Sequence, residues 1–375
     1  MIDQTLAILH DAYRELNAKK LFWVVLLISG IVVLVFAAVG VKDDRLTLLW
    51  FDTPMLIPIT PGEFYRRMFV KLGITYWLTF GATILAIIST ASTFPDFITG
   101  GSIDLYLSKP ISRLRLFATK LVAGLLFVTL QVFVFAAASF LVIGLRGKVW
   151  EPGIFLAVPL VLCFFSYLYA FLVLFGILTR STLAAVLLTV LVWFTLSVFH
   201  YSEQGLLVFI KAGEREAVMR EKRIQWLDGR LAYFDKQPEE ERAGSENVIT
   251  SFREQRDQLV EERGSTTLRN MQFFHKIAYG VMTVLPKTTE TVEVMTRRLL
   301  ADFQREHADL LEEDVDEPPD VTSPKVRRRN IIRPAVRQVE EATGRRSLTW
   351  IIGTSLAFEA GVLAVAAWVF CRRDY

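Results

Sequence analysis

The sequence has little cysteine and little histidine, and these shortages exclude several kinds of site. Its two cysteines, Cys163 and Cys371, lie within or at the end of apolar runs. They provide neither a disulfide framework nor a Cys-x-x-Cys metal site. The four histidines stand singly along the chain and offer no zinc-ligand spacing; they are His10, His200, His275 and His307.

Motifs for binding nucleotides and for hydrolysis are also missing. The chain has no Gly-x-x-x-x-Gly-Lys-Ser/Thr phosphate loop, and no Gly-x-Gly-x-x-Gly follows a strand pattern. His-Glu-x-x-His and Gly-x-Ser-x-Gly are absent as well. We therefore expect no catalytic residue, no cofactor-binding residue and no metal ligand in this chain.

The net charge gives little information about the class of protein, whereas the hydrophobicity indicates that class clearly. The formal net charge is only +3, which gives no reason to expect a nucleic-acid partner. Hydrophobic residues make up 53% of the chain, and aromatic residues make up 12%. This composition is too apolar for a soluble protein of 375 residues and is typical of membrane proteins.

Six apolar runs are long enough to cross about 30 Å of hydrocarbon as helices, which takes about 20 residues each. The runs are continuous rather than alternating, which excludes a membrane β-barrel. The sequence therefore predicts an all-α integral membrane protein with six transmembrane helices, at 21–41, 73–93, 115–145, 153–179, 182–200 and 348–370.

Positive charge favours one side of this bundle. If the runs alternate in direction, most basic residues of the short loops fall on one face, which is then cytoplasmic. Arg66, Arg67 and Arg146 lie on the opposite face, so the bias is not complete. We expect a multi-pass protein of a cell membrane, with a bacterial inner membrane favoured and both termini cytoplasmic.

Two segments beside the first runs are predicted to lie at the membrane surface. Residues 1–20 carry apolar side chains at helical spacing and are expected to form an amphipathic helix on the cytoplasmic face. The alternative is a helix packed on a soluble partner. Residues 42–72 are expected to form an outer loop, broken by prolines and lying partly in the membrane interface.

The stretch from Phe94 to Lys120 lies between the second and third runs and is amphipathic in its first part. Gly100 and Gly101 allow a sharp bend there. Pro110 disfavours the α conformation at Lys109 and so ends the first short helix. Such a helix, lying on the surface between two spans, suits a lever that another protein pushes.

This stretch resembles the membrane subunits of ABC-2 type exporters. The matching residues are Gly101-Ser-Ile-Asp-Leu-Tyr-Leu-Ser-Lys-Pro-Ile-Ser-Arg113, followed by Lys120. The family's acidic residue before the glycine is replaced by Thr99 or displaced to Asp96. The start, AYRELNAKKLFW, and the end, FCRRDY, are also similar to the family. The resemblance covers 1–200 and 348–375 but not 201–347.

The resemblance implies a function and a set of partners. A separate ABC ATPase subunit would bind ATP and dock on the coupling segment 94–113. The permease would form a homodimer or pair with a homologous permease subunit in membrane lipid. The implied activity is export of an amphiphile, lipid, glycan, peptide or drug, and the sequence chooses none of these. The residues implied in coupling are Asp96, Phe97, Asp104, Leu107, Lys109, Pro110 and Arg113.

Residues 201–347 predict a large helical extracytoplasmic insertion between the fifth and sixth helices. Two apolar stripes, one from Ile224 to Phe234 and one from Ile249 to Leu259, favour a hairpin of coiled-coil character. Residues 268–285 predict either an interfacial helix or a buried helix of this domain. An acidic, proline-rich segment at 312–334 is expected to be a flexible linker. The domain could bind an envelope protein.

Glu359 lies midway along the last apolar run, where a charged carboxylate costs about 2.5–3.5 kcal/mol to insert. It is therefore expected to face the bundle or a wet cavity, or to be protonated. One interpretation is a residue of a substrate pathway or gate. The other is a structural hydrogen bond to a threonine, serine or glutamine on a neighbouring span, for instance to Gln131. Gly353, Ala357 and Gly361 in the same run predict a close-packing face.

Two further functions stay open. The six spans could anchor 201–347 as a scaffold without transport, or a transporter lineage could drive a mechanical change in that domain. A scaffold would need no ATPase partner. An ion-coupled secondary transporter using Glu359 is weaker, because such proteins usually carry inverted repeats and more ionisable groups within the membrane.

Overall fold

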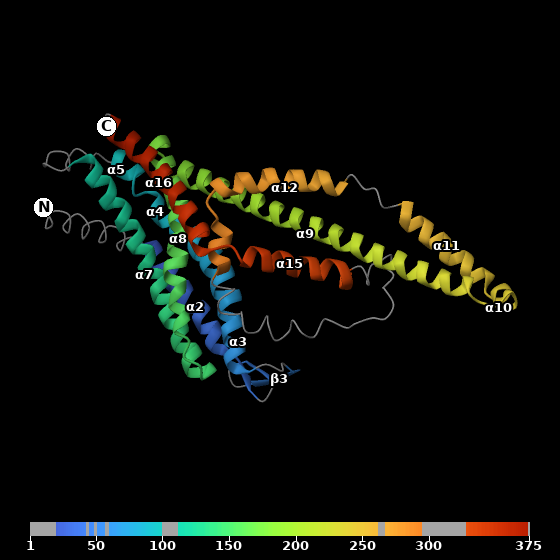
Figure 1. Cartoon of the computed structure of the whole chain (residues 1–375). Coiled ribbons are helices and arrows are strands. Elements are labelled where there is room, and N and C mark those ends of the chain that lie inside the picture. The colour runs from blue at the N-terminus through green and yellow to red at the C-terminus, as the bar shows by residue number, and fades with distance from the viewer. Residues whose placement is uncertain are drawn as a thin grey trace. The chain divides into compact units, whose positions relative to one another are not determined.

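The computed structural model describes residues 20–42, 45–48, 51–56, 60–99, 112–261, 267–294 and 328–373 (Figure 1). Apart from Lys20, the predicted surface helix at 1–20 lies outside the described residues. So do the middle of the coupling segment, 100–111, and most of the predicted linker at 312–334. The described chain is mainly helical.

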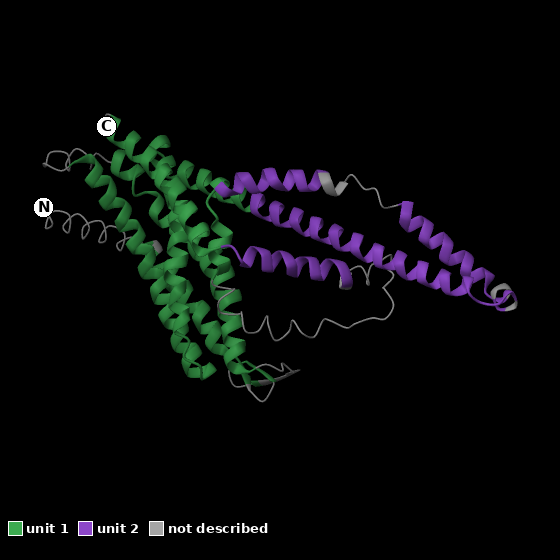
Figure 2. Cartoon of the chain, viewed as in Figure 1, with its two compact units in different colours: residues 1–197, 284–305, 347–375 green, residues 198–283, 306–346 purple. Residues whose placement is uncertain are grey.

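The chain divides into two compact units (Figure 2). Unit 1 comprises Met1–Ser197, Val284–Arg305 and Ser347–Tyr375, and unit 2 comprises Val198–Thr283 and Glu306–Arg346. Unit 2 begins and ends within three residues of the predicted boundaries at 201 and 347, but it is interrupted by 284–305, which belongs to unit 1. The described residues 284–294 belong to the unit of the apolar helices, although they follow more than 80 residues of unit 2 along the chain.

Five helices of the described chain are long and apolar enough to cross a membrane, so the protein is a helical membrane protein. They are Pro61–Thr99, Arg113–Gly147, Pro152–Thr179, Thr182–Asp235 and Leu348–Arg372. The predicted first span is α2 (Lys20–Ala38), whose apolar part, Phe22–Ala38, is shorter than these five.

The predicted outer loop at 42–72 contains more regular structure than its prolines indicated. Three short strands, β1 (Val39–Lys42), β2 (Arg45–Leu48) and β3 (Phe51–Leu56), pair antiparallel in the order β1-β2-β3. Pro61 begins a helix rather than breaking one, because the first helical position needs no donated N–H. Thr60 caps this helix by accepting from the Glu63 amide at 3.3 Å.

The second span therefore starts earlier than predicted and has an unusual winding. It consists of α3 (Pro61–Met68), a π-helical stretch η1 (Phe69–Ala82), α4 (Thr83–Ala91) and α5 (Pro95–Thr99). Three threonines follow the wider winding, since each hydroxyl donates to the carbonyl five residues earlier. These bonds join Thr75 to Val70, Thr79 to Ile74 and Thr83 to Leu78 at 2.7–3.1 Å.

Serine caps and left-handed residues set the ends of the later spans. Ser112 accepts from the Arg115 amide at the start of α7 (Arg113–Gly147), and Ser347 does so from Trp350 at the start of α16 (Leu348–Arg372). The short helix η2 (Pro152–Leu156) leads into α8 (Ala157–Thr179). The residues after α7 and α8, Lys148 and Arg180, both have a φ of 54°.

Helix α8 occupies the centre of unit 1. Its 23 residues contain no charged side chain, and it packs against α4, α7 and α16. Phe164, Phe165 and Leu168 are fully buried between these helices. Helix α2 packs on α7 and on η1. Of the predicted close-packing face of α16, Gly353 and Gly361 have no neighbour among the described residues within 4 Å of a Cβ position.

Unit 2 is built along the second part of one 54-residue helix, α9 (Thr182–Asp235). After α10 (Glu239–Gly244), helix α11 (Glu246–Glu261) packs on the distal part of α9 through Trp226, Phe234 and Phe252. Arg256 also bonds Asp228 there at 3.0 Å. The predicted fifth span and the first arm of the hairpin are thus one continuous helix.

The proximal part of α9 holds two other helices of unit 2, α12 (Thr267–Val284) and α15 (Arg333–Gly344), the latter preceded by η5 (Arg328–Ile332). Glu203 of α9 is completely buried, and its Oε1 lies 3.2 Å from His275 Nε2 and 3.2 Å from Arg346 Nη2. One carboxylate therefore joins α9, α12 and the residues after α15.

Candidate functional site

The predicted coupling residues divide between described and undescribed positions. Asp104, Leu107, Lys109 and Pro110 fall within 100–111 and lie outside the described residues. Asp96, Phe97 and Arg113 are described and flank that gap. Asp96 is exposed on α5, whereas Phe97 is buried.

Phe97 belongs to an aromatic cluster at the end of α5. Its ring stacks on Phe370 of α16, and Phe370 also contacts Phe94 and Phe117. The Lys120 Nζ lies 5.3 Å from the centre of the Phe97 ring. Such a cation–π contact adds a favourable electrostatic term to the packing. Phe97 of the predicted coupling segment and Lys120 of the exporter-like motif are therefore in contact with each other.

Arg113 lies at the other flank and binds the end of α16. Its Nη1 donates to the carbonyl oxygens of Arg373 at 2.7 Å and of Cys371 at 3.3 Å. Arg373 in turn donates to the Ile177 carbonyl at 2.6 Å near the end of α8. Guanidinium groups are favourable at the C-terminal ends of helices, where carbonyls lack helical partners. The two arginines thereby join α7, α16 and α8.

Glu359 lies inside unit 1, as its position in an apolar run required. It is 8% exposed, and its Oε2 accepts a hydrogen bond from Ser166 Oγ of α8 at 2.8 Å. The same hydroxyl also donates to the Cys163 carbonyl at 2.9 Å, so it is shared between the two acceptors. The predicted partner Gln131 is therefore wrong, although a serine on a neighbouring span was among the expected kinds of partner.

A second set of buried polar groups joins the 284–294 segment to α16, the helix of Glu359, near the start of that helix. Lys287 is only 2% exposed, and its Nζ donates to Thr354 Oγ1 at 2.7 Å. The ammonium also lies 4.2 Å from the centre of the Trp350 ring. The Lys287 amide donates to Ser355 Oγ at 2.9 Å. These contacts fix the 284–294 segment on the first two turns of α16.

These two sets belong to one face of α16. Ser355 and Glu359 are four residues apart, so they project from the same side of the helix. The Tyr167 hydroxyl of α8 is buried next to the hydroxyls of Ser355 and Thr291. We call this set, namely Ser166, Tyr167, Lys287, Thr291, Ser355 and Glu359, the polar core of unit 1.

The polar core brings ionisable groups into a unit whose outer surface is apolar. Lys287, Glu290 and Glu359 are all buried. Ionisable residues within a membrane-spanning unit are costly and usually serve a function, such as a pathway for a polar group or proton. The sequence identified Glu359 but missed Lys287 and Thr291. The sequence after Pro286 mixes threonines with charged residues, but this pattern does not show which of the two units buries the segment.

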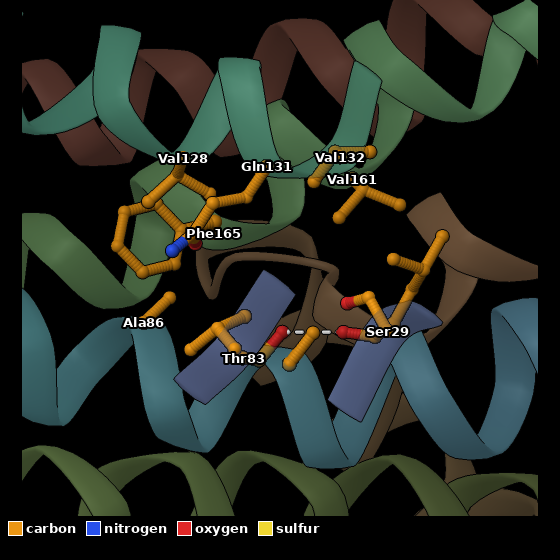
Figure 3. A pocket seen from close by; sticks show the side chains of 11 residues that line it. Ser29, Thr83, Ala86, Val128, Gln131, Val132, Val161 and Phe165 are labelled. Atoms are coloured by element: carbon orange, nitrogen blue, oxygen red, sulfur yellow. Dashed lines mark hydrogen bonds between the residues drawn. The ribbon is translucent and has the colours of Figure 1, made fainter. Parts of the chain in front are cut away.

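A small cavity lies elsewhere in unit 1, between α2, the end of η1, the start of α4, α7 and α8 (Figure 3). Its polar lining comes from Ser29, Thr83 and Gln131, and it has about 10 Å³ of space, which is about enough for one water molecule. Ser29 accepts from Trp77 Nε1 at 3.1 Å. The Gln131 side chain extends into the cavity, and its Nε2 has no hydrogen-bond partner among the described residues.

No group of three or more metal-ligating side chains occurs among the described residues. Comparison with protein-family models, with curated proteins and with solved structures finds no match to this chain. The likeness to ABC-2 exporters therefore depends on the sequence alone, namely on the motif from Gly101 to Lys120 and on the segments AYRELNAKKLFW and FCRRDY.

Proposed function

We propose that this chain is the membrane-spanning subunit of an ABC exporter of the ABC-2 type. It would move a substrate across a cell membrane with ATP hydrolysed by a separate subunit, and it would work as a homodimer or with a homologous permease. Six spans with both termini cytoplasmic fit the proposal if α2 also crosses. Its 19 residues span about 28 Å as a helix, close to the thickness of the hydrocarbon.

The observation that supports coupling is that both flanks of the motif are fixed to transmembrane helices. On one side Phe97 packs on Phe370, and on the other Arg113 binds the last carbonyls of α16. A segment fixed at both ends transmits a displacement to whatever holds those ends. A push by an ATPase on 100–111 would therefore act on α7 and α16 directly.

The polar core supports a role for α16 in the pathway. Its carboxylate, ammonium and hydroxyls lie between α8, α16 and 284–294. A small rotation of α16 would separate Glu359 from Ser166 and Ser355 from Lys287 together. We propose that this separation opens a polar route beside α16, with Glu359 as its gating residue.

The test is purification of the chain from its native membrane in a mild detergent. We expect an ATP-binding subunit in equal amount, with ATPase activity. Asp104→Lys should lower the recovery of that subunit by about tenfold or more, because an uncompensated interfacial charge costs about 2 kcal/mol or more. Insertion of the chain should be unchanged.

Glu254→Lys is the matched control, because it reverses an exposed charge on α11, far along the chain from the motif. Equal recovery of the ATPase with both variants would count against 94–113 as the coupling segment. Arg113 is less suitable for this test, since its substitution also removes the contacts with α16.

The scaffold interpretation makes a different prediction for the same purification. Unit 2 is a separate compact unit with its own helix contacts, which is what a scaffold would present to an envelope protein. If no ATPase is recovered but an envelope protein remains bound through 201–347, the chain anchors that domain and does not transport.

A further inference from the structure

Helix α12 of unit 2 exposes large apolar side chains on the side that faces away from α9. Its inner side carries Gln272 and His275, which bond Glu214 and Glu203 of α9 at 3.4 and 3.2 Å. Its outer side carries Phe273, Phe274, Ile277 and Val281, and both phenylalanines are 61% exposed. We call these four residues the outer face of α12.

The outer face is regular rather than accidental. Residues 273, 277 and 281 recur every four residues, so they form one stripe along the helix, with Phe274 beside it. In a helix surrounded by water, the exposed side is the polar one. Here Gln272 and His275 bond α9 on the side that also buries Met282, and Lys276 is exposed at the margin of the apolar stripe.

The C-terminal end of α12 is connected by a short segment to residues that bind the start of α16. Val284 is the last residue of α12, and Lys287 follows three residues later. Lys287 binds Thr354 and Trp350, which lie in the first two turns of α16 after its cap at Ser347. Three residues of extended chain reach about 10 Å at most. The end of α12 therefore lies near the membrane boundary at which α16 begins.

We propose that α12 lies in the lipid headgroup region on the side of the membrane where α16 begins, with its outer face toward the acyl chains. The occupant of this face is the bilayer itself, continuous with the lipid around the spans of unit 1. Aromatic and aliphatic side chains on one side and a lysine at the margin are the pattern of interfacial helices. Lys276 can extend its ammonium toward the headgroups.

The proposal is tested in the full chain reconstituted into vesicles of phosphatidylethanolamine and phosphatidylglycerol. Cys163 and Cys371 are first replaced by alanine, and a spin label is then attached to a single cysteine at position 273, 277 or 281. We expect collisions with oxygen to exceed collisions with a water-soluble nickel chelate several-fold at all three positions.

Val248→Cys is the matched control. Val248 lies on α11 of the same unit, and its side chain is 44% exposed, nearly the same as the 43% of Val281. A label there should collide mainly with the nickel chelate. Nickel collisions at 277 and 281 as frequent as at 248 would place the outer face in water and overturn the proposal.

Two other results are also decisive. If neither reagent reaches 273, 277 and 281, a second copy or another protein covers the face, and the lipid assignment is wrong. If the labelled variants do not fold, the unaltered chain can be treated with a photoreactive lipid carrying its diazirine near the headgroup. Cross-links within 273–284 but not within 246–261 are then expected, and the reverse distribution would overturn the proposal.

Discussion

Ser166 of α8 gives Glu359 the hydrogen bond that lets a carboxyl group lie inside unit 1. Ser166→Ala removes that donor from a buried acceptor. We expect the free energy of unfolding to fall by about 1–3 kcal/mol, since a buried polar atom then loses its partner. Thermal unfolding in detergent measures the effect. Ser197→Ala is the matched control, because Ser197 donates only to the Trp193 carbonyl of its own helix.

Glu359→Gln separates the structural and gating roles of this residue. Glutamine keeps the size of the side chain and an oxygen that can accept from Ser166, but it cannot ionise. We expect the ATP-dependent activity of the complex to fall while the unfolding temperature stays close to that of the unaltered chain. Full activity together with a lower unfolding temperature would assign Glu359 a structural role only.

Lys287 fixes 284–294 to α16 through its ammonium group. Lys287→Met keeps an unbranched side chain but removes the bond to Thr354 and the cation–π contact with Trp350. We expect a loss of about 1.5–3 kcal/mol, the range for hydrogen bonds of charged groups. Lys276→Met, on the exposed margin of α12, should leave the unfolding temperature nearly unchanged. Equal effects of both substitutions would contradict the role given to Lys287.

At the scale of elements, the close contact of α7 with α8 depends on Gly124. A Cβ at this position would lie 2.2 Å from the Tyr169 hydroxyl and 2.7 Å from its ring carbon Cζ. Gly124→Ala should therefore destabilise unit 1 by about 1–3 kcal/mol through overpacking. Tyr169→Phe in the same chain should recover part of the loss, because it removes only the hydroxyl.

Gly205→Ala provides the comparison for this prediction. In the part of the chain that the structure describes, nothing lies within 4 Å of a Cβ at Gly205, which is within α9. Alanine in the interior of a helix is about 0.5–1 kcal/mol more favourable than glycine, so the unfolding temperature should rise slightly or stay the same. A loss as large as that of Gly124→Ala would show that the close approach of α7 and α8 is not the cause.

In unit 2, Glu203 joins α9 to α12 and to the residues that follow α15. Glu203→Ala removes the carboxylate that His275 and Arg346 share. Removing one partner of a buried ion pair costs about 3–5 kcal/mol. We expect faster amide hydrogen exchange in 200–214, 270–283 and 333–344, with the exchange of α8 unchanged. Unchanged exchange in these three segments would show that the carboxylate does not hold the helices together.

Helices were predictable where one periodicity in the sequence specifies them. Features that depend on contacts between residues far apart in the sequence were not predictable. The continuous apolar runs predicted α7, α8 and α16 closely, because burial or lipid on all sides requires apolar residues throughout. The start of the second span at Pro61 and the strands β1 to β3 were missed, since prolines and mixed polarity are also typical of loops. Lys287 was missed because its partners, Thr354 and Trp350, lie more than 60 residues away.

At the scale of the whole molecule, the sequence pattern predicted the membrane class, but it did not predict that a segment within 201–347 belongs to the unit of the apolar helices. Residues 284–294 are part of unit 1 and hold the inner face of α16 through Lys287 and Ser355. No periodicity within a short amphipathic segment specifies which of two units buries it. The position of Glu359 was predictable because a carboxylate in an apolar run must face inward, whereas its partner Ser166 was not.

The polar core also has a consequence for how the protein is made. Ser166 is synthesised 193 residues before Glu359, and Lys287 is synthesised 68 residues before Ser355. At about 5–20 residues per second, the ribosome needs about 10–40 s to produce the carboxylate that Ser166 binds. During that time α8 is already in the membrane with its serine and tyrosine facing an incomplete bundle. The protein therefore depends, for tens of seconds in each round of translation, on lipid, translocation machinery or a membrane chaperone to cover the place that α16 later fills.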